Sequence, residues 1–234
     1  MARIGILVPP GNPTVEPEMT AMTPPGVTLH FTRMHASGVT GSLSGQEARN
    51  REQIAGLDAN IALLAMVKPA VIGLAHTATS YTLGRSDEAA LLARLNATHQ
   101  VPVVTAFGSV LAALAHLGVT RIAFGTPYSL DTTLQGKALL ESCGLTVTAF
   151  GRLEGVTNIY DETLERAAIL ARQVDHVDAQ AVFLSGVGMP TVGVIAALET
   201  ELGKPVLSAA SALMWNLLRH AEARGAAGFG RLFA

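Results

Sequence analysis

Short apolar runs rich in β-branched residues alternate along this chain with longer segments whose apolar residues recur at helical spacing. The apolar runs are candidate strands, at residues 3–9, 27–34, 70–77, 101–106, 121–127, 145–153, 181–188 and 205–211. The helix-like segments are 46–66, 87–97, 108–117, 129–142, 161–175, 191–202 and 212–223. This alternation predicts βα units and parallel sheets whose faces are both covered by helices.

The last four candidate strands repeat the first four. The stretch LAHT (74–77) corresponds to LSGV (184–187), and VPVVTAFGSVLAALAHLG (101–118) corresponds to KPVLSAASALMWNLLRHA (204–221). We therefore predict an α/β protein made of two similar four-stranded parallel-sheet domains, flavodoxin-like and related by a pseudo-twofold axis. The expected domains are residues 1–107 plus 212–234, and residues 108–211.

Ligands of open parallel sheets bind beyond the carboxyl ends of the strands, so two such domains predict an active-site cleft between matching strand ends. The repeat makes His76 and Gly186 counterparts on facing walls of this cleft. Histidine titrates near neutrality and can serve as a general acid or base. A histidine at a strand end can equally be a hydrogen-bonded structural residue.

Four strand-end loops carry polar groups suited to binding a carboxylate. The first, residues 8–19, contains three prolines before residue 14 that prevent a regular helix start and leave Asn12 either to face a ligand or to cap a turn. The second, residues 76–82, offers the hydroxyls of Thr77, Thr79 and Ser80, which can form an anion nest or cap the following helix.

The other two loops belong to the second domain. Residues 125–133 carry Tyr128, whose hydroxyl can close a carboxylate pocket or whose ring can cover the domain edge. Residues 184–191 offer the Ser185 hydroxyl, and glycines such as Gly186 let the backbone at Val187 approach a ligand. A dinucleotide site is not supported, because the complete glycine motif and its acidic partner are missing.

Composition and charge limit the classes of molecule that this chain can bind. The formal net charge is −2 and there is no run of Lys or Arg, so the chain has no electrostatic footprint for nucleic acid or an anionic membrane. No apolar run approaches the roughly 20 residues of a membrane span, and we expect a cytoplasmic protein, monomeric or homodimeric, with a small-molecule substrate. We expect no metal site, because the single cysteine excludes a cysteine-rich one.

A family resemblance rests on motifs that run from the first strand to the last residues. The stretches PPGNPTVEPEM, FTRM, the hydroxyl-rich 76–82 loop, GTPYSLDTT, LSGVG and GFGRLF resemble, in their order and spacing, the maleate isomerase and arylmalonate decarboxylase branch of the aspartate/glutamate racemase superfamily. The resemblance implies two facing parallel-sheet domains and an enzyme that acts on small carboxylic acids without a cofactor.

The resemblance also implies roles for individual residues. It assigns Asn12, Thr77, Tyr128 and the backbone of Val187 to carboxylate binding, while Ala78 replaces a serine of the decarboxylase and leaves Thr79 and Ser80 to compensate. Asn158 matches a polar position beside the substrate of maleate isomerases, or it caps the helix near residue 161. For Arg33 we favour a structural salt bridge over a carboxylate contact.

The chain departs from the family at the catalytic cysteines, whose two strand-end positions are His76 and Gly186 here. Cys143 lies at a predicted helix end, where we expect a buried small side chain. We therefore expect a cysteine-independent enzyme that decarboxylates, isomerises, hydrates or hydrolyses a small carboxylate, with His76 as acid/base and Tyr128 or Ser185 as further catalytic groups. The alternatives are a carboxylate-binding protein without catalysis and a nucleotide-using protein, whose phosphate loop is missing.

Overall fold

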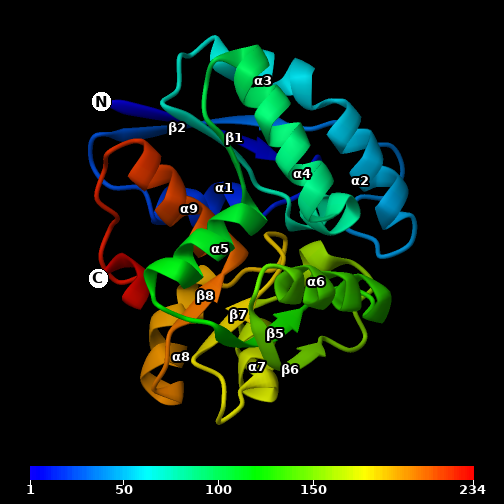
Figure 1. Ribbon diagram of the computed structural model, residues 1–234, viewed down its shortest axis with the longest axis vertical. Helices are drawn as coiled ribbons and strands as arrows, with labels where there is room; N and C mark the ends of the chain where they lie inside the picture. The colour runs from blue at the N-terminus through cyan, green and yellow to red at the C-terminus, as the bar shows by residue number, and fades with distance from the viewer.

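The computed structural model describes residues 1–234 and has two lobes, each built on a four-stranded parallel sheet (Figure 1). The first sheet has the order β2-β1-β3-β4, and the second has the order β6-β5-β7-β8. The strands are β1 (Ala2–Val8), β2 (Val27–Arg33), β3 (Val71–Leu74), β4 (Val103–Thr105), β5 (Arg121–Thr126), β6 (Thr146–Arg152), β7 (Ala181–Leu184) and β8 (Val206–Ser208). The predicted pair of sheets is confirmed, and the shared strand order is the structural form of the sequence repeat.

Nine α-helices connect and cover the sheets, with short 3-10 turns between some of them (Figure 1). The helices are α1 (Val15–Ala21), α2 (Gln46–Ala55), α3 (Leu57–Ala65), α4 (Thr77–His99), α5 (Ala106–His116), α6 (Leu130–Ser142), α7 (Leu164–Val174), α8 (Ile195–Leu202) and α9 (Ala209–His220). The 3-10 turns are η1 (Ile159–Asp161), η2 (Val192–Val194) and η3 (Arg231–Phe233). None of the helices combines the length and the apolar character that crossing a bilayer requires.

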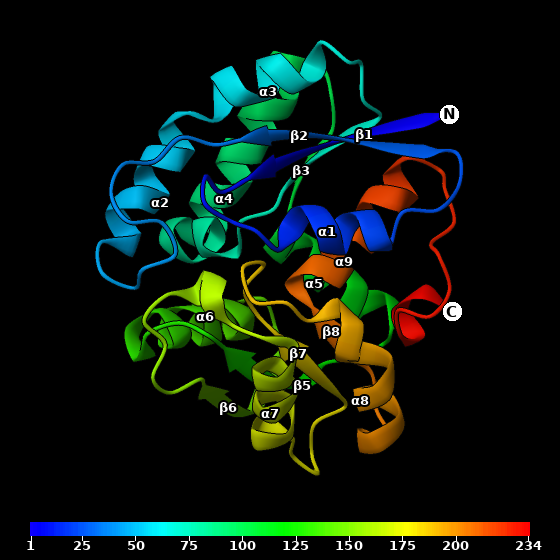
Figure 2. The same cartoon turned by 180° about the vertical axis from the view of Figure 1, so that it is seen from behind.

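The largest apolar core lies between the two sheets. Figure 2 shows α1, α5 and α9 in the layer between the lobes, while α3 covers the outer face of the first sheet and α7 that of the second. A single cluster of 35 buried residues joins side chains of β1, β5, β7 and α9. Since this cluster belongs to both lobes, the lobes are held together by continuous apolar packing as well as by polar contacts.

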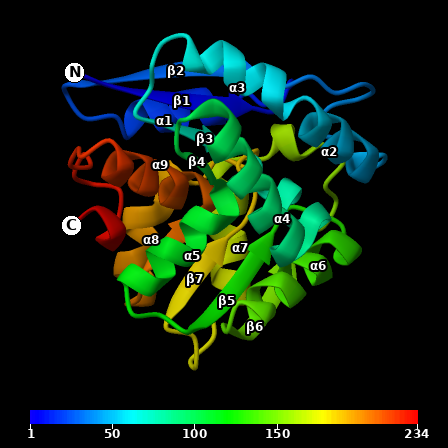
Figure 3. The same cartoon turned by 45° about the horizontal axis from the view of Figure 1, so that its top comes forward.

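Helix α9 follows the last strand of the second sheet but packs against β3 of the first. A glycine makes this close approach possible: a Cβ atom at Gly73 would lie 2.9 Å from Cδ1 and 3.0 Å from Cδ2 of Leu217 on α9. The chain therefore returns to the first lobe at its end. On the other side of the molecule, α4 and α6 run side by side where the lobes meet (Figure 3).

Several predicted boundaries were wrong. The segment 76–82 is not a loop, because α4 begins at Thr77 and continues through a kink at Gly84, where φ is 72°. The segment 46–66 is two helices that meet at Gly56. The strands expected to end at residues 77, 188 and 211 end three or four residues earlier, and the strand expected to end at residue 106 ends one residue earlier. In each case helix or loop geometry begins directly after the strand.

Replacing Gly73 by alanine should destabilise the protein by roughly 1–3 kcal/mol, because the new methyl group overpacks against Leu217. The measurement is the free energy of unfolding in denaturant. Gly56→Ala is the matched control, since φ there is −87° and its Cβ would meet other atoms only at 3.4 Å or more. An equal loss in both variants would contradict close packing of α9 on β3.

Candidate active site

His76 forms the N-cap of α4, directly after the first sheet's central strand β3. Its extended backbone (φ −149°, ψ 93°) turns the chain into the helix, and its Nδ1 lies 2.8 Å from Thr79 Oγ1 in a shared hydrogen bond. The side chain is buried, and burial lowers the pKa of the imidazole to about 4. The ring is therefore neutral at neutral pH, and its Nε2 atom has no partner within the protein.

Thr77 is the first residue of α4 and is fully buried, yet its Oγ1 atom completes no hydrogen bond. The first amides of a helix also have no partner within the helix, so hydroxyl and amide donors coincide here. The hydroxyl lies close to the phenol of Tyr128. A buried polar atom without a partner is unusual and marks this place as a candidate ligand position.

Tyr128 comes from the second lobe and contacts the counterpart of His76. A Cβ atom at Gly186 would lie 3.1 Å from the Tyr128 hydroxyl oxygen, and φ at Gly186 is +95°. A side chain at position 186 would therefore need a strained backbone and would compete with the phenol for the same space. Burial raises the pKa of Tyr128, so the phenol stays protonated and can donate a hydrogen bond.

Tyr81 is a site residue that sequence reasoning missed. Its hydroxyl oxygen lies 2.7 Å from Ser185 Oγ, which joins α4 of the first lobe to the end of β7 in the second. Its ring packs edge-on against Tyr128, and burial raises the pKa of its hydroxyl. The sequence feature that could have identified Tyr81 is its position four residues after Thr77. This spacing places both side chains on one helix face once residues 76–82 are recognised as helical.

Three side chains of the first lobe form hydrogen bonds with backbone groups of the second. Asn12 Nδ2 donates to the Val187 carbonyl at 3.2 Å, and Thr14 Oγ1 donates to the Gly188 carbonyl at 2.9 Å. Glu18 Oε1 accepts from the backbone N–H groups of Thr191 at 2.5 Å and Val192 at 2.7 Å. We call residues 12–18 and 187–192 together the interlobe clasp. It fixes the backbone beside Gly186.

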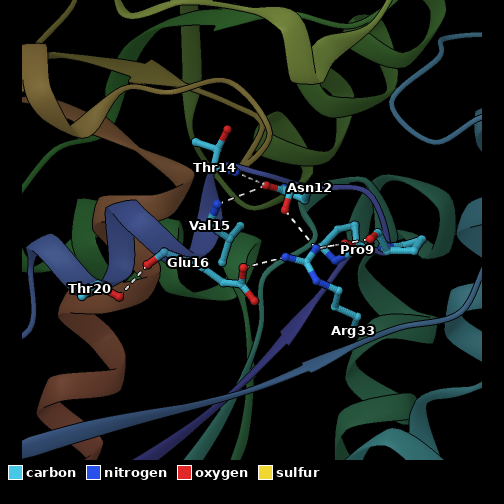
Figure 4. Close-up of polar contacts among 8 residues, drawn as sticks. Pro9, Asn12, Thr14, Val15, Glu16, Thr20 and Arg33 are labelled. Atoms are coloured by element: carbon cyan, nitrogen blue, oxygen red, sulfur yellow. Dashed lines mark hydrogen bonds and ion pairs between the residues drawn. The ribbon is translucent and has the colours of Figure 1, made fainter.

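The Asn12 side chain caps the turn that leads into α1, which is one of the two roles expected for it. The expectation that the prolines prevent a helix start within residues 8–19 was wrong, because α1 begins at Val15. The Oδ1 atom of Asn12 accepts from the N–H groups of Thr14 at 2.8 Å and Val15 at 3.1 Å (Figure 4). Arg33 donates to the Asn12 carbonyl at 3.0 Å and pairs with Glu16 at 2.5 Å. Arg33 thus forms the expected salt bridge and holds the loop that carries Asn12.

Other predicted site residues have different partners. Ser80 donates to Glu88 at 2.6 Å and does not join the group around Thr77. Asn158 accepts from the Tyr160 N–H at 2.9 Å and donates to the Thr40 carbonyl at 3.2 Å, so it caps η1 and bridges the lobes. Cys143 lies at the C-cap of α6 and is only half-buried, which corrects the expectation of a buried side chain.

The candidate site is enclosed in this conformation. No side chain among His76, Thr77, Tyr128 and Ser185 is more than 9% exposed. A cavity of about 280 Å³ lies beside the first turns of α4 and is lined by Ala78, Tyr81 and Thr82 together with residues of α2 and the start of α6. No group of three or more His, Cys, Asp or Glu side chains is placed to hold a metal ion.

Comparison with known proteins identifies the family. The arylmalonate decarboxylase family model matches residues 4–233, nearly the whole chain. The chain belongs to the arylmalonate decarboxylase family. It is 30% identical to a maleate isomerase of Nocardia farcinica over 98% of this chain and 94% of the relative. It is also 31% identical to the arylmalonate decarboxylase of Bordetella bronchiseptica over 70% of this chain and 71% of the relative.

Solved structures of family members share the fold. A cysteine-to-serine variant of Nocardia farcinica maleate cis-trans isomerase with a covalently bound succinylcysteine intermediate superposes with a TM-score of 0.90, at 28% identity over 99% of this chain and 98% of that one. A liganded double variant of arylmalonate decarboxylase gives 0.88 at 26% identity, over 100% and 99% of the two chains. Both superpositions cover the two lobes and the interlobe clasp.

The Glu18 carboxyl of the clasp should make this family member's stability depend on pH. Burial raises its pKa from 4.5 to about 7, against the opposing effect of the two N–H donors. The folded protein therefore holds this proton more tightly than the unfolded chain does. Consequently the contribution of Glu18 to unfolding free energy falls between about pH 4.5 and pH 7, by about 3 kcal/mol in all.

Glu18→Gln should remove this dependence, because the amide oxygen still accepts both N–H groups but carries no charge. As the pH rises from 5 to 8, the wild type should lose stability that the variant keeps. The unfolding free energy of the variant, measured relative to that of the wild type, should therefore increase over this range. The control is Glu16→Gln, which changes an exposed carboxylate of the same helix and should keep the wild-type dependence. If the unfolding free energies of wild type and Glu18→Gln changed with pH in the same way, the raised pKa of Glu18 would be refuted.

Proposed function

We propose that this protein is a cofactor-independent enzyme that acts on a small carboxylic or dicarboxylic acid, with His76 as the acid/base and without a cysteine nucleophile. The observation that carries the proposal is the buried Thr77 hydroxyl without a partner, next to His76 and facing Tyr128. The family relatives are named as maleate isomerases and an arylmalonate decarboxylase, which supports a small carboxylate as the substrate.

The substrate carboxylate would accept hydrogen bonds at the start of α4. Thr77 Oγ1 and the first amides of the helix supply donors from the first lobe, and the protonated phenol of Tyr128 supplies one from the second. These donors are fixed by packing before the ligand arrives, so little reorganisation is needed when negative charge grows during the reaction. Thr79 orients the imidazole through its bond to Nδ1 and leaves Nε2 for the substrate.

The neutral imidazole sets the direction of the first proton transfer. Because burial holds the pKa of His76 near 4, the ring begins the reaction as a proton acceptor at neutral pH. Among decarboxylation, isomerisation, hydration and hydrolysis, this state favours the reactions that begin by removing a proton from carbon or water. Tyr128 would then stabilise the resulting oxyanion. Since the opposite wall offers only Gly186, a reaction that creates a stereocentre should give one enantiomer.

Covalent catalysis by cysteine, which the succinylcysteine of the Nocardia relative indicates for that enzyme, has no counterpart group at this site. The only cysteine, Cys143, follows α6 at the end opposite to Tyr128. Thirteen helical residues at about 1.5 Å each place it roughly 20 Å away along the helix. Ser185 is the nearest alternative nucleophile, and its hydroxyl is engaged by Tyr81.

His76→Ala should lower turnover by roughly a hundredfold or more while leaving carboxylate affinity nearly unchanged, because it removes the proton acceptor and none of the carboxylate donors. Thr77→Val should instead weaken binding, because it removes a donor from the carboxylate site. Rates and dissociation constants would be measured with maleate and phenylmalonate as first substrates. Full turnover by His76→Ala would show that His76 is structural.

Cys143→Ser should retain wild-type turnover, since its thiol lies far from the carboxylate donors. The assay is the same, with and without pretreatment by a thiol reagent. Loss of turnover in Cys143→Ser with an unchanged unfolding midpoint would disprove the cysteine-independent mechanism. Saturable carboxylate binding by wild type, with no turnover of any carboxylate tested, would instead identify a carboxylate-binding protein on this fold.

A further inference from the structure

A large cavity lies where α5, α9 and the last residues of the chain, red in Figure 1, come together. Its volume is about 510 Å³. The lining combines apolar side chains, Trp215 and Phe233 among them, with three basic ones, His116, Arg219 and Arg224. No acidic side chain lines it, and it shares no residue with the candidate active site or the interlobe clasp.

Helix α9 presents opposite faces to the first sheet and to this cavity. Leu213 and Leu217 face the sheet, where both pack against Gly73 of β3. Trp215 and Arg219 each follow one of these leucines by two residues, and two residues turn an α-helix by about 200°. Their side chains therefore point away from β3. One helix thus contacts the strand that leads to the candidate active site and also lines the cavity.

The Arg219 guanidinium is ordered by stacking. Its Cζ atom lies 4.7 Å from the centroid of the Trp215 ring, and the His116 ring lies 5.0 Å from that ring, centroid to centroid. Stacking uses the face of a guanidinium and leaves the N–H groups at its edge free to donate. Neither Arg219 nor Arg224 donates a hydrogen bond within the protein, and no carboxylate lies within ion-pair distance of either. Both are donors whose acceptor the protein does not supply.

The apolar side of the cavity is built as firmly as the basic side. Leu218 and Leu232 are buried, and the Phe233 ring fills the space that a side chain at Gly225 would need. Arginines on a solvated surface commonly have no partner, but here two of them border one cavity beside an apolar wall. A pocket of this size, with an apolar lining and a few converging polar groups, is typical of small-molecule sites.

We propose that this cavity is a second ligand site, separate from the candidate active site, which binds a small organic anion with an apolar body, such as an aryl carboxylate. Arg219 and Arg224 bind the carboxylate, and Leu218, Leu232 and Phe233 pack against the apolar body. Arginine suits this role because its planar N–H groups match the two oxygens of a carboxylate. The inference goes beyond the proposed function and does not depend on it.

The test uses the only tryptophan of the chain, Trp215, as a reporter of ligand binding at the cavity. Phenylacetate is titrated into the protein, and tryptophan fluorescence is followed with excitation at a wavelength that tyrosine does not absorb. We expect a saturable change whose apparent affinity falls as salt is added, because the arginines are exposed. A wild-type protein whose fluorescence does not respond would overturn the proposal.

Two related ligands separate the contributions of charge and apolar body. Phenylacetamide has the shape of phenylacetate without the charge, and acetate has the carboxylate without the ring. Each should bind at least tenfold more weakly than phenylacetate. Equal affinity for phenylacetamide would refute the arginine contacts, and equal affinity for acetate would refute the apolar contacts.

Variants test the two sides of the cavity separately. Arg224→Gln, which leaves the stacked pair of Arg219 and Trp215 intact, should lose about tenfold in phenylacetate affinity, and Arg219→Gln should lose a similar amount. Ala223→Leu keeps the charge but fills part of the cavity, so it should also weaken binding. Arg51→Gln is the control, because this exposed arginine pairs with Glu47 on α2 and should bind phenylacetate like wild type. Wild-type affinity in all three cavity variants would refute the site.

A further comparison distinguishes this site from the candidate active site, which is also proposed to bind carboxylates. Thr77→Val should leave the fluorescence titration unchanged, because Thr77 does not line the cavity. If Thr77→Val abolishes the fluorescence response, the signal originates at the candidate active site and the second site is refuted. A wild-type response in a protein that turns over no carboxylate would support the second site while the proposed function fails.

Discussion

The interlobe clasp is the contact on which the candidate site depends. Its three side chains, Asn12, Thr14 and Glu18, all come from the start of one lobe and bind backbone groups of residues 187, 188, 191 and 192 of the other. The apolar layer of α1, α5 and α9 joins the lobes but does not determine their alignment to within a hydrogen bond. Directional polar contacts do so, and they place Gly186 and Val187 opposite the start of α4.

Burial gives this site its electrostatic character. It lowers the pKa of His76 and raises those of Tyr81 and Tyr128, so each of these groups is neutral at neutral pH. A carboxylate entering between them would carry the only full charge and would be held by oriented hydroxyl and amide dipoles. Under the proposed function, this arrangement would bind an anion without a buried counter-charge and would leave the imidazole free to accept a proton.

Glycine and tyrosine are complementary around residues 185–188. At Gly186 the left-handed backbone and the missing side chain leave room for the Tyr128 hydroxyl, and at Gly188 the missing side chain leaves room for the Tyr160 ring. The wall opposite His76 therefore presents phenol hydroxyls and bare backbone. In this chain that wall can donate hydrogen bonds, but it offers no thiol, which is why a single acid/base at His76 accounts for the chemistry proposed.

The amino-acid sequence determined the strands, their repeat and the positions of His76, Thr77, Tyr128 and Ser185 at strand ends, because alternating apolar runs and parallel topology follow from local patterns. It did not determine that α4 begins at Thr77 or that Ser80 pairs with Glu88, since both depend on how His76 caps the helix and on the kink at Gly84. Only the tertiary structure brought Tyr81 to Ser185, Tyr160 to Gly188 and Asn12 to Val187. These contacts join residues 28 to 175 positions apart, and no local pattern encodes which distant backbone a side chain meets.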